Sequence, residues 1–190
     1  MDWIVAFILI PAGPCLATAA ESPLSYRKDI LPILTRAGCN MGACHGAQTG
    51  KGDLNLSLRG ELAQEDHAIL LQSFIRTDRP ERSPILRKPT LETDHEGGER
   101  FTKDSESYRL LDQWIRQGAP FALPDEPTLE RVDVTPSQRV VFAPETEVAI
   151  TVTAVYSDGS TRDVNRWALF EASELNVEVS DNGLVTRLRP

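Results

Sequence analysis

Two cysteines and a histidine near residue 40 stand in an order typical of covalent cofactor attachment. Four residues separate Cys39 from Cys44, and His45 follows the second cysteine directly. Covalent attachment of haem uses two thiols to capture the two vinyl groups, and the adjacent histidine then lies under the iron as an axial ligand. The usual spacing is C-x-x-C-H, so this C-x4-C-H variant needs a bulged loop. Gly42 makes such a bulge sterically possible.

Two other interpretations of the cysteine pair have to be weighed against haem attachment. Cysteines of an exported protein commonly form a disulfide, and cysteine counting alone does not favour haem over a Cys39–Cys44 disulfide. A structural zinc site needs about four protein ligands. Beyond Cys15, the chain offers these two cysteines and three histidines, at positions 45, 67 and 95, without finger-like spacing. Zinc is therefore the weakest of the three hypotheses.

The N-terminus has the pattern of an export signal. An apolar run over residues 3–10 is followed by small residues at 17–20, which resemble a cleavage site. We therefore predict that residues 1–20 are a signal peptide, that Cys15 is removed with it, and that the protein lies in the periplasm or at the cell surface of a bacterium. Asp2 and the lack of Lys or Arg before the apolar run are atypical. No other apolar stretch is long enough to cross a bilayer, so we expect no membrane span in the mature chain.

The charge distribution argues against a nucleic-acid partner. The formal net charge is −8, and residues 21–123 carry 14 Lys and Arg against 15 Asp and Glu. Residues 124–190 carry 6 against 12, so the acidity belongs to the C-terminal third. No stretch is basic enough to neutralise a run of phosphates.

Apolar side chains at helical spacing predict several helices around the cysteine motif. Residues 25–34 have one apolar face, and Pro32 either kinks this helix or begins a second turn. Residues 65–74 and 83–88 are predicted as two shorter helices, and residues 105–118 as a capped amphipathic helix. These helices supply few core residues, so we expect a buried haem to complete the core.

The C-terminal third has the pattern of β-structure. A proline-rich linker over residues 121–130 leads into it, and the hydrophobic period then becomes two. Residues 148–156 alternate as one strand, the turn at 158–159 begins a hairpin, and a second hairpin surrounds residues 181–183. We therefore predict a β domain after the linker.

The first part of the chain resembles the planctomycete-type cytochrome c domains that open large exported bacterial proteins. The resemblance covers roughly residues 26–120 and is carried by Ile30-Leu31-Pro32-Ile33-Leu34, Gly38-Cys39-Asn40, Gly42-Ala43-Cys44-His45-Gly46, Leu56-Ser57-Leu58-Arg59-Gly60, Lys88-Pro89-Thr90, His95-Glu96-Gly97-Gly98, Trp114-Ile115 and Gly118-Ala119. It implies an all-α class I-like cytochrome c domain over residues 21–120. In that domain Cys39 and Cys44 would hold haem c, and His45 would be an axial ligand of its iron.

The last part resembles the bacterial Ig-like group 2 domain. The motifs are Val132-Asp133-Val134-Thr135-Pro136, Tyr156-Ser157-Asp158-Gly159-Ser160-Thr161 and Asn182-Gly183-Leu184-Val185-Thr186. The resemblance covers residues 131–188 and implies an all-β Ig-like sandwich over residues 131–190. The chain stops where closing strands would follow, so we predict an incomplete sandwich in a fragment of a longer protein.

The same cytochrome resemblance places the second iron ligand at His95. In the related domains a loop ahead of the last helix supplies a methionine, and residues 94–98 occupy that place here. Met41 lies inside the binding loop and cannot reach the opposite haem face, whereas imidazole is a strong iron ligand. The alternatives are a solvated His95, which leaves the iron open, and His67 as a reserve ligand.

Two functions remain open on the sequence. The first is an exported module that transfers electrons by haem c to a redox partner protein or to a downstream domain. The second is a haem-free adhesion or scaffold protein with a Cys39–Cys44 disulfide. The residues show no catalytic constellation, because the carboxylates around His95 fit a solvated acidic loop. The sequence therefore gives no reason to expect an enzyme.

Overall fold

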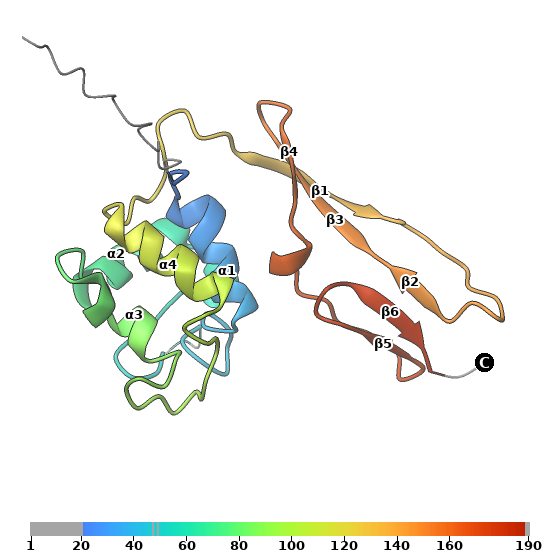
Figure 1. Ribbon diagram of the computed structural model, residues 1–190, viewed down its shortest axis with the longest axis horizontal. Coiled ribbons are helices and arrows are strands. Elements are labelled where there is room, and N and C mark those ends of the chain that lie inside the picture. Colours follow the sequence, from blue (N-terminus) through green and yellow to red (C-terminus); the bar gives the residue numbers. More distant parts are fainter. Residues whose placement is uncertain (1–20, 47, 49, 189–190) are drawn as a thin grey trace, which may run out of the picture.

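The structure is a computed structural model that describes residues 21–46, 48 and 50–188. The predicted signal peptide, residues 1–20, lies outside these residues. Figure 1 shows helices gathered at one side and extended strands reaching away from them. We call residues 21–126 the helical part and residues 127–188 the β part.

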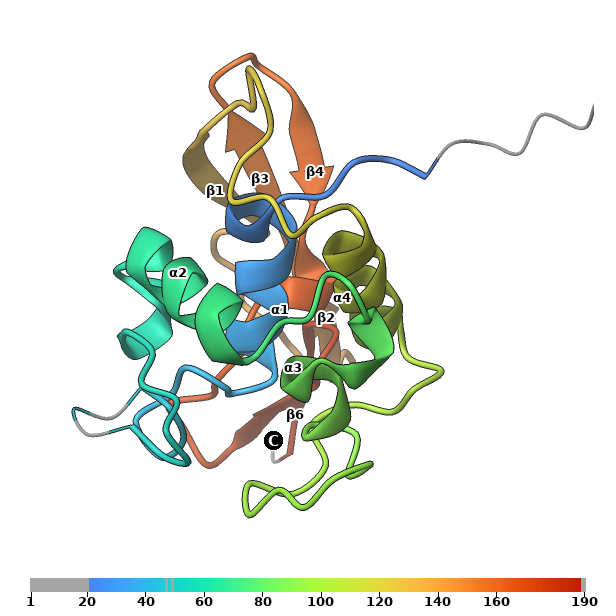
Figure 2. The ribbon, with the colours of Figure 1, turned by 90° about the vertical axis from the view of Figure 1, so that its left-hand side faces the viewer.

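The helical part contains short helices joined by long turns. The α-helices of the described residues are α1 (Leu31–Arg36), α2 (Ala63–Ser73), α3 (Pro84–Arg87) and α4 (Glu106–Arg116). A π-helical turn (Tyr26–Ile30) precedes α1, and 3-10 turns lie at Leu58–Gly60 and Pro80–Arg82. In Figure 2, α1 has α2 on one side and α4 on the other.

Local sequence features set the limits of these helices. The Ser25 hydroxyl accepts a hydrogen bond from the Lys28 amide at 3.1 Å, which begins the first helical turn. Pro32 falls in the first turn of α1, where its missing N–H costs no hydrogen bond, so the chain continues as a second helix. The Ser105 hydroxyl caps α4 through the Tyr108 amide at 3.2 Å. The helices predicted at 25–34, 65–74, 83–88 and 105–118 are thus confirmed within a few residues.

An aromatic cluster packs the end of α4 against the π-helical turn that begins at Tyr26. The ring of Tyr26 lies 5.2 Å from that of His67 and 5.8 Å from that of Trp114, measured between centroids. Trp114 Nε1 donates a hydrogen bond to the carbonyl of Pro120 at 3.0 Å. His67 Nε2 bonds the carbonyl of Ala119 at 2.8 Å. Residues 119 and 120, which lead out of α4, are therefore held by side chains of the core.

The β part consists of two three-stranded antiparallel sheets. The strands are β1 (Leu129–Thr135), β2 (Glu147–Ala149), β3 (Thr151–Tyr156), β4 (Thr161–Asp163), β5 (Val177–Val179) and β6 (Leu184–Arg187). One sheet has the order β1-β3-β4 and the other the order β2-β6-β5. The predicted hairpins around residues 158–159 and 181–183 are confirmed as β3–β4 and β5–β6.

The predicted single strand over residues 148–156 is wrong. It is divided at Ile150 into β2 and β3, which belong to different sheets. The Ile150 amide donates to the Gly183 carbonyl at 2.8 Å, so the chain at this residue is bonded to the β5–β6 turn. The side chain of Asn165 donates to the Ile150 carbonyl at 2.7 Å and accepts from the Val152 amide. These long-range bonds fix the position of the division.

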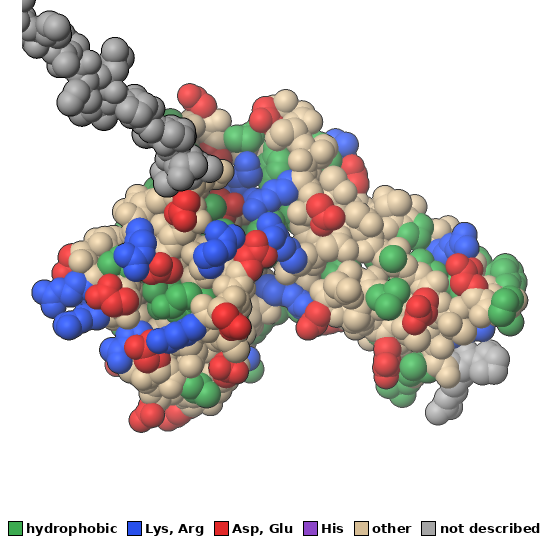
Figure 3. All heavy atoms as spheres, in the orientation of Figure 1, with side chains coloured by type: hydrophobic (Ala, Val, Ile, Leu, Met, Phe, Trp, Pro, Cys, Tyr) green, Lys and Arg blue, Asp and Glu red, His purple; other side chains and the backbone are tan. Residues whose placement is uncertain are grey.

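Charged side chains connect the two parts. Arg162 Nη1 in β4 lies 2.8 Å from Oδ1 of the buried Asp29, and Arg36 Nη2 lies 2.7 Å from Asp181 Oδ1. Within the β part, the guanidinium groups of Arg162 and Arg166 lie 3.9 and 4.2 Å from the centre of the Trp167 ring, and Trp167 itself packs against the core of the helical part. Figure 3 shows basic and acidic side chains meeting over this boundary.

The fold class expected from the sequence is wrong. The chain is not an all-α class I-like cytochrome c domain followed by an incomplete all-β Ig-like sandwich, because it has four short helices and two small sheets in the described ranges. Glycine and proline interrupt the first part, so its longest α-helices have 11 residues each. Every residue of β1 is exposed, so no second layer packs over that strand as a sandwich requires.

Candidate functional site

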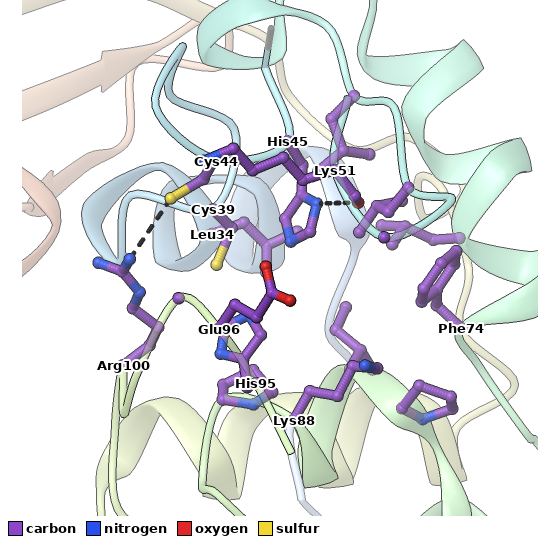
Figure 4. A pocket seen from close by; sticks show the side chains of 18 of the residues that line it. Leu34, Cys39, Cys44, His45, Lys51, Phe74, Lys88, His95, Glu96 and Arg100 are labelled. Atoms are coloured by element: carbon purple, nitrogen blue, oxygen red, sulfur yellow. Dashed lines mark hydrogen bonds between the residues drawn. The ribbon is translucent and has the colours of Figure 1, made fainter. Parts of the chain in front are cut away.

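A cavity of about 600 Å³ lies in the helical part, and we call it the thiol cavity. One wall is the cysteine loop, defined as residues 38–46, and the facing wall is the segment from α3 to residue 100 (Figure 4). The four site residues named from the sequence all line it: Cys39, Cys44, His45 and His95. The structure therefore brings together side chains that are up to 56 positions apart in the chain.

Backbone hydrogen bonds close the cysteine loop on itself. The His45 amide donates to the Cys39 carbonyl at 3.0 Å, and the amides of Cys44 and Gly46 donate to the Met41 carbonyl at 2.9 and 3.0 Å. A Cβ atom on Gly46 would lie 2.1 Å from the Asn40 carbonyl oxygen, so this close approach requires glycine. The four residues between the cysteines thus form a compact bulge with both cysteines at its base.

The two thiols are free and differ in their surroundings. Both side chains are partly buried. Burial raises the pKa of the Cys39 thiol to about 11, the positive charge of Arg100 acts in the opposite direction, and the nearby Cys44 adds to the increase. Arg100 Nη2 donates a hydrogen bond to Cys44 Sγ at 3.4 Å (Figure 4). A cationic group therefore forms a hydrogen bond with Cys44, whereas Cys39 packs against the hydrophobic core.

The rings of His45 and His95 face each other across the cavity. Their centroids are 6.3 Å apart and their planes differ by 16°. His45 Nδ1 bonds the Lys51 carbonyl at 2.9 Å, and His95 Nδ1 bonds the Gly98 carbonyl at 2.8 Å. A carbonyl only accepts, so the Nδ1 atom of each ring carries a proton. The Nε2 atom of His45 is then the acceptor of that ring in its neutral form. Burial lowers the pKa of His45 below its usual value, which favours that neutral form.

The remainder of the cavity has an apolar floor and a charged rim. The floor is formed by Leu34, Leu54, Leu56, Leu70, Phe74 and Ile85. Basic side chains of Lys51, Lys88 and Arg100 line it together with the acidic Asp94 and Glu96. Figure 4 shows Glu96 and Lys88 on the wall opposite the cysteine loop. The arrangement suits an organic ligand with a large apolar portion and a polar or charged end.

Two residues behave differently from the sequence-based expectations. His67, the reserve iron ligand, lies in the aromatic cluster and bonds Ala119 instead of lining the cavity. Arg100 was not predicted as a site residue, although it contacts Cys44 from 56 residues away. The only feature of the sequence near Arg100 is its position two residues after Gly98. That position does not predict a contact with the cysteine loop.

The expected cofactor, covalently attached haem c with its iron, is contradicted. Over the described residues, no group of three or more His, Cys, Asp or Glu side chains is arranged to hold a metal ion. The two histidines come together as a pair. We therefore derive no chemistry from haem at this site.

Comparisons with known proteins provide no relative for this chain. No protein family, curated protein or solved structure matches it. The resemblances to cytochrome c and Ig-like domains stay predictions from the sequence. No helix among the residues that the structure covers is both long and apolar enough to cross a membrane.

Proposed function

We propose that the helical part is a binding module for a small, largely apolar organic molecule with an acidic group, held in the thiol cavity. One observation carries this proposal: a cavity of about 600 Å³ combines an apolar floor with three basic side chains, which outnumber the acidic Asp94 and Glu96 in its lining. Small-molecule sites commonly have volumes of about 300–1,000 Å³ and a few polar groups that orient the ligand. Burial of the apolar portion supplies affinity, and a basic side chain pairs with the acidic group.

Lys88 is the basic residue best placed to test the charge preference. It lines the cavity and lies on the wall opposite the cysteine loop (Figure 4). Its Nζ atom donates to the carbonyl of Asp94 at 3.3 Å, which keeps the ammonium group near His95 and the cavity wall. Lys103 is a matched control, because it is an exposed lysine that pairs with Glu92 and does not line the cavity.

The test is a fluorescence titration with anilinonaphthalene sulfonate, an apolar fluorophore that carries one negative charge. We expect saturable binding at one site, several-fold weaker binding by Lys88→Gln, and unchanged binding by Lys103→Gln. Far-ultraviolet circular dichroism of the three proteins checks that the fold is intact. Equal affinities of the two variants, or a signal that never saturates, would disprove the proposal.

The proposed function also includes export of the protein and binding of a partner by the β part. The apolar run over residues 3–10 and the small residues that follow support secretion across the inner membrane of a bacterium. The β part then serves as an interaction module beside the binding module, and a redox partner stays a prediction. Expression in a bacterial host, followed by fractionation and mass measurement, tests export: mature protein in the periplasm should begin near residue 21.

A further inference from the structure

Backbone hydrogen bonds of the cysteine loop bring the chain at Cys44 and His45 close to the chain at Cys39. The hydrogen bond from the His45 amide to the Cys39 carbonyl, at 3.0 Å, brings the backbone next to Cys44 against that of Cys39. Disulfide formation needs such a close approach of two backbones, with Cα atoms about 4.4–6.8 Å apart. Because Met41 and Gly46 close the same loop through a 3.0 Å bond, the approach does not depend on one contact.

The two thiols differ in a way that assigns them different roles. Arg100 donates to Cys44 Sγ at 3.4 Å, and a cationic donor stabilises negative charge on a thiolate sulfur. Among the described residues no cationic group donates a hydrogen bond to Cys39 Sγ. Cys39 packs against the core, where burial raises its pKa more strongly than the charge of Arg100 lowers it. The hydrogen bond from Arg100 therefore favours Cys44 as the attacking thiol and Cys39 as the thiol that completes the reaction.

We propose that Cys39 and Cys44 form a dithiol–disulfide couple that reduces small, negatively charged disulfides entering the thiol cavity. Both cysteines line the cavity, so a small molecule inside it meets both sulfurs. The three basic side chains in the lining outnumber the acidic Asp94 and Glu96, and this excess of positive charge favours a substrate that carries carboxylates. This activity uses the same cavity as the proposed binding function, but it needs the two thiols and no resident ligand.

The reaction proceeds by two exchanges that balance atoms and electrons. The Cys44 thiolate attacks one sulfur of the small disulfide, whose S–S bond breaks and releases a first thiolate. The Cys39 thiol then loses its proton to that thiolate and attacks the Cys44 sulfur, which releases the second thiolate. This second thiolate takes up a proton from water, which balances the proton that Cys44 gave to water when its thiolate formed. The small disulfide thus gains two electrons and two protons as two thiols. Cys39 and Cys44 lose the same two electrons and two protons and become joined.

Oxidised glutathione, which carries carboxylates, is the probe for the experiment. The full chain with Cys15→Ser is reduced, mixed with oxidised and reduced glutathione at several ratios, quenched with acid, alkylated and weighed by mass spectrometry. We expect an intramolecular disulfide with little mixed product. Cys39→Ser should instead retain one glutathione on Cys44, and Cys44→Ser should remain unmodified over the same time.

Variants of Arg100 test whether the reactivity of Cys44 depends on this cation or only on the exposure of its thiol. Arg100→Gln should slow the first exchange about tenfold, and Arg100→Lys should restore part of the rate, because a cation at this place assists Cys44. Equal glutathione uptake by Cys39→Ser and Cys44→Ser would overturn the assignment of roles. Two thiols that stay free at every ratio would overturn the couple itself. Neither outcome bears on the fluorophore titration, so the two proposals can fail separately.

Discussion

The helical part and the β part bury apolar residues to very different extents. Of the 21 buried hydrophobic residues in the described chain, 17 form the core of the helical part and 4 lie in β3. Several large side chains of the β part stay exposed, such as Phe142, which is 74% exposed, and Leu175, which is 99% exposed. The comparison teaches that the helical part has its own core, whereas the β part depends on strand pairing and on its contacts with the helices.

The largest expected effect contrasts Trp114 with Phe142. Trp114 is fully buried and bonded to Pro120, so Trp114→Ala should lower the free energy of unfolding by about 3–5 kcal/mol. Phe142→Ala should change it by less than about 0.5 kcal/mol, because that ring is exposed. Denaturant unfolding of the full chain, followed by circular dichroism, measures both. Similar losses for the two variants would contradict the difference between the parts.

A second prediction concerns two glycines of the cysteine loop. A Cβ atom at position 46 would collide with the Asn40 carbonyl, whereas one at position 42 meets nothing within 4 Å. Gly46→Ala should therefore destabilise the helical part by about 1–3 kcal/mol through overpacking, and Gly42→Ala should have little effect. Urea unfolding of the two variants gives the comparison. A greater loss for Gly42→Ala would mean that the loop has another conformation.

A third, smaller effect is expected at the boundary of the two parts. Arg162 and Asp29 form a partly buried ion pair at 2.8 Å, with side chains 28% and 8% exposed. A double-mutant cycle with Arg162→Gln and Asp29→Asn should give a coupling energy of about 1–2 kcal/mol. The exposed pair of Arg139 and Glu145, inside the β part, is the control and should give less than about 1 kcal/mol. No excess of the boundary pair over the control would show that the two parts are held together by other contacts.

The smallest effect is the pH dependence contributed by His45. Burial lowers the pKa of His45 in the folded protein, so between that value and the unfolded value of about 6.5 the unfolded chain binds more protons. Stability should therefore fall as the pH drops below about 6.5 and through the folded pKa. His45→Gln should weaken this dependence. Unfolding at a series of pH values tests it, with the ring titration followed by nuclear magnetic resonance. A ring that titrates above its usual pKa would reverse the sign.

Local features were predictable from the sequence, whereas contacts between distant segments were not. The Ser105 cap and the two hairpin turns lie within a few residues of the elements that they limit, so their patterns identified α4, β3–β4 and β5–β6. The division of residues 148–156 was missed because the alternation is the same on both sides of Ile150. The contact of Arg100 with Cys44 spans 56 residues and has no local pattern.

The architecture predicted from the sequence was also more regular than the one in the structure. Helical spacing over residues 25–34 predicts a helix, but it does not show that the helices are too few and short for an all-α domain. Alternation in the β part likewise predicts strands without showing whether two sheets stack. The predicted site residues line one cavity, whereas haem c, the cofactor predicted for them, is contradicted.

Asn165 has a mechanical consequence for the β part. Its amide group bonds the Ile150 carbonyl at 2.7 Å and the Asn182 carbonyl at 3.2 Å, and its oxygen accepts from Val152. Where a chain passes from one sheet to another, its peptide groups lose the strand partners that would satisfy them. One side chain supplies these partners and resists rotation of the two sheets about Ile150. A force that pulls on residues 147–156 is thus borne by main-chain hydrogen bonds and by the side-chain amide of Asn165, which links the chain on both sides of Ile150.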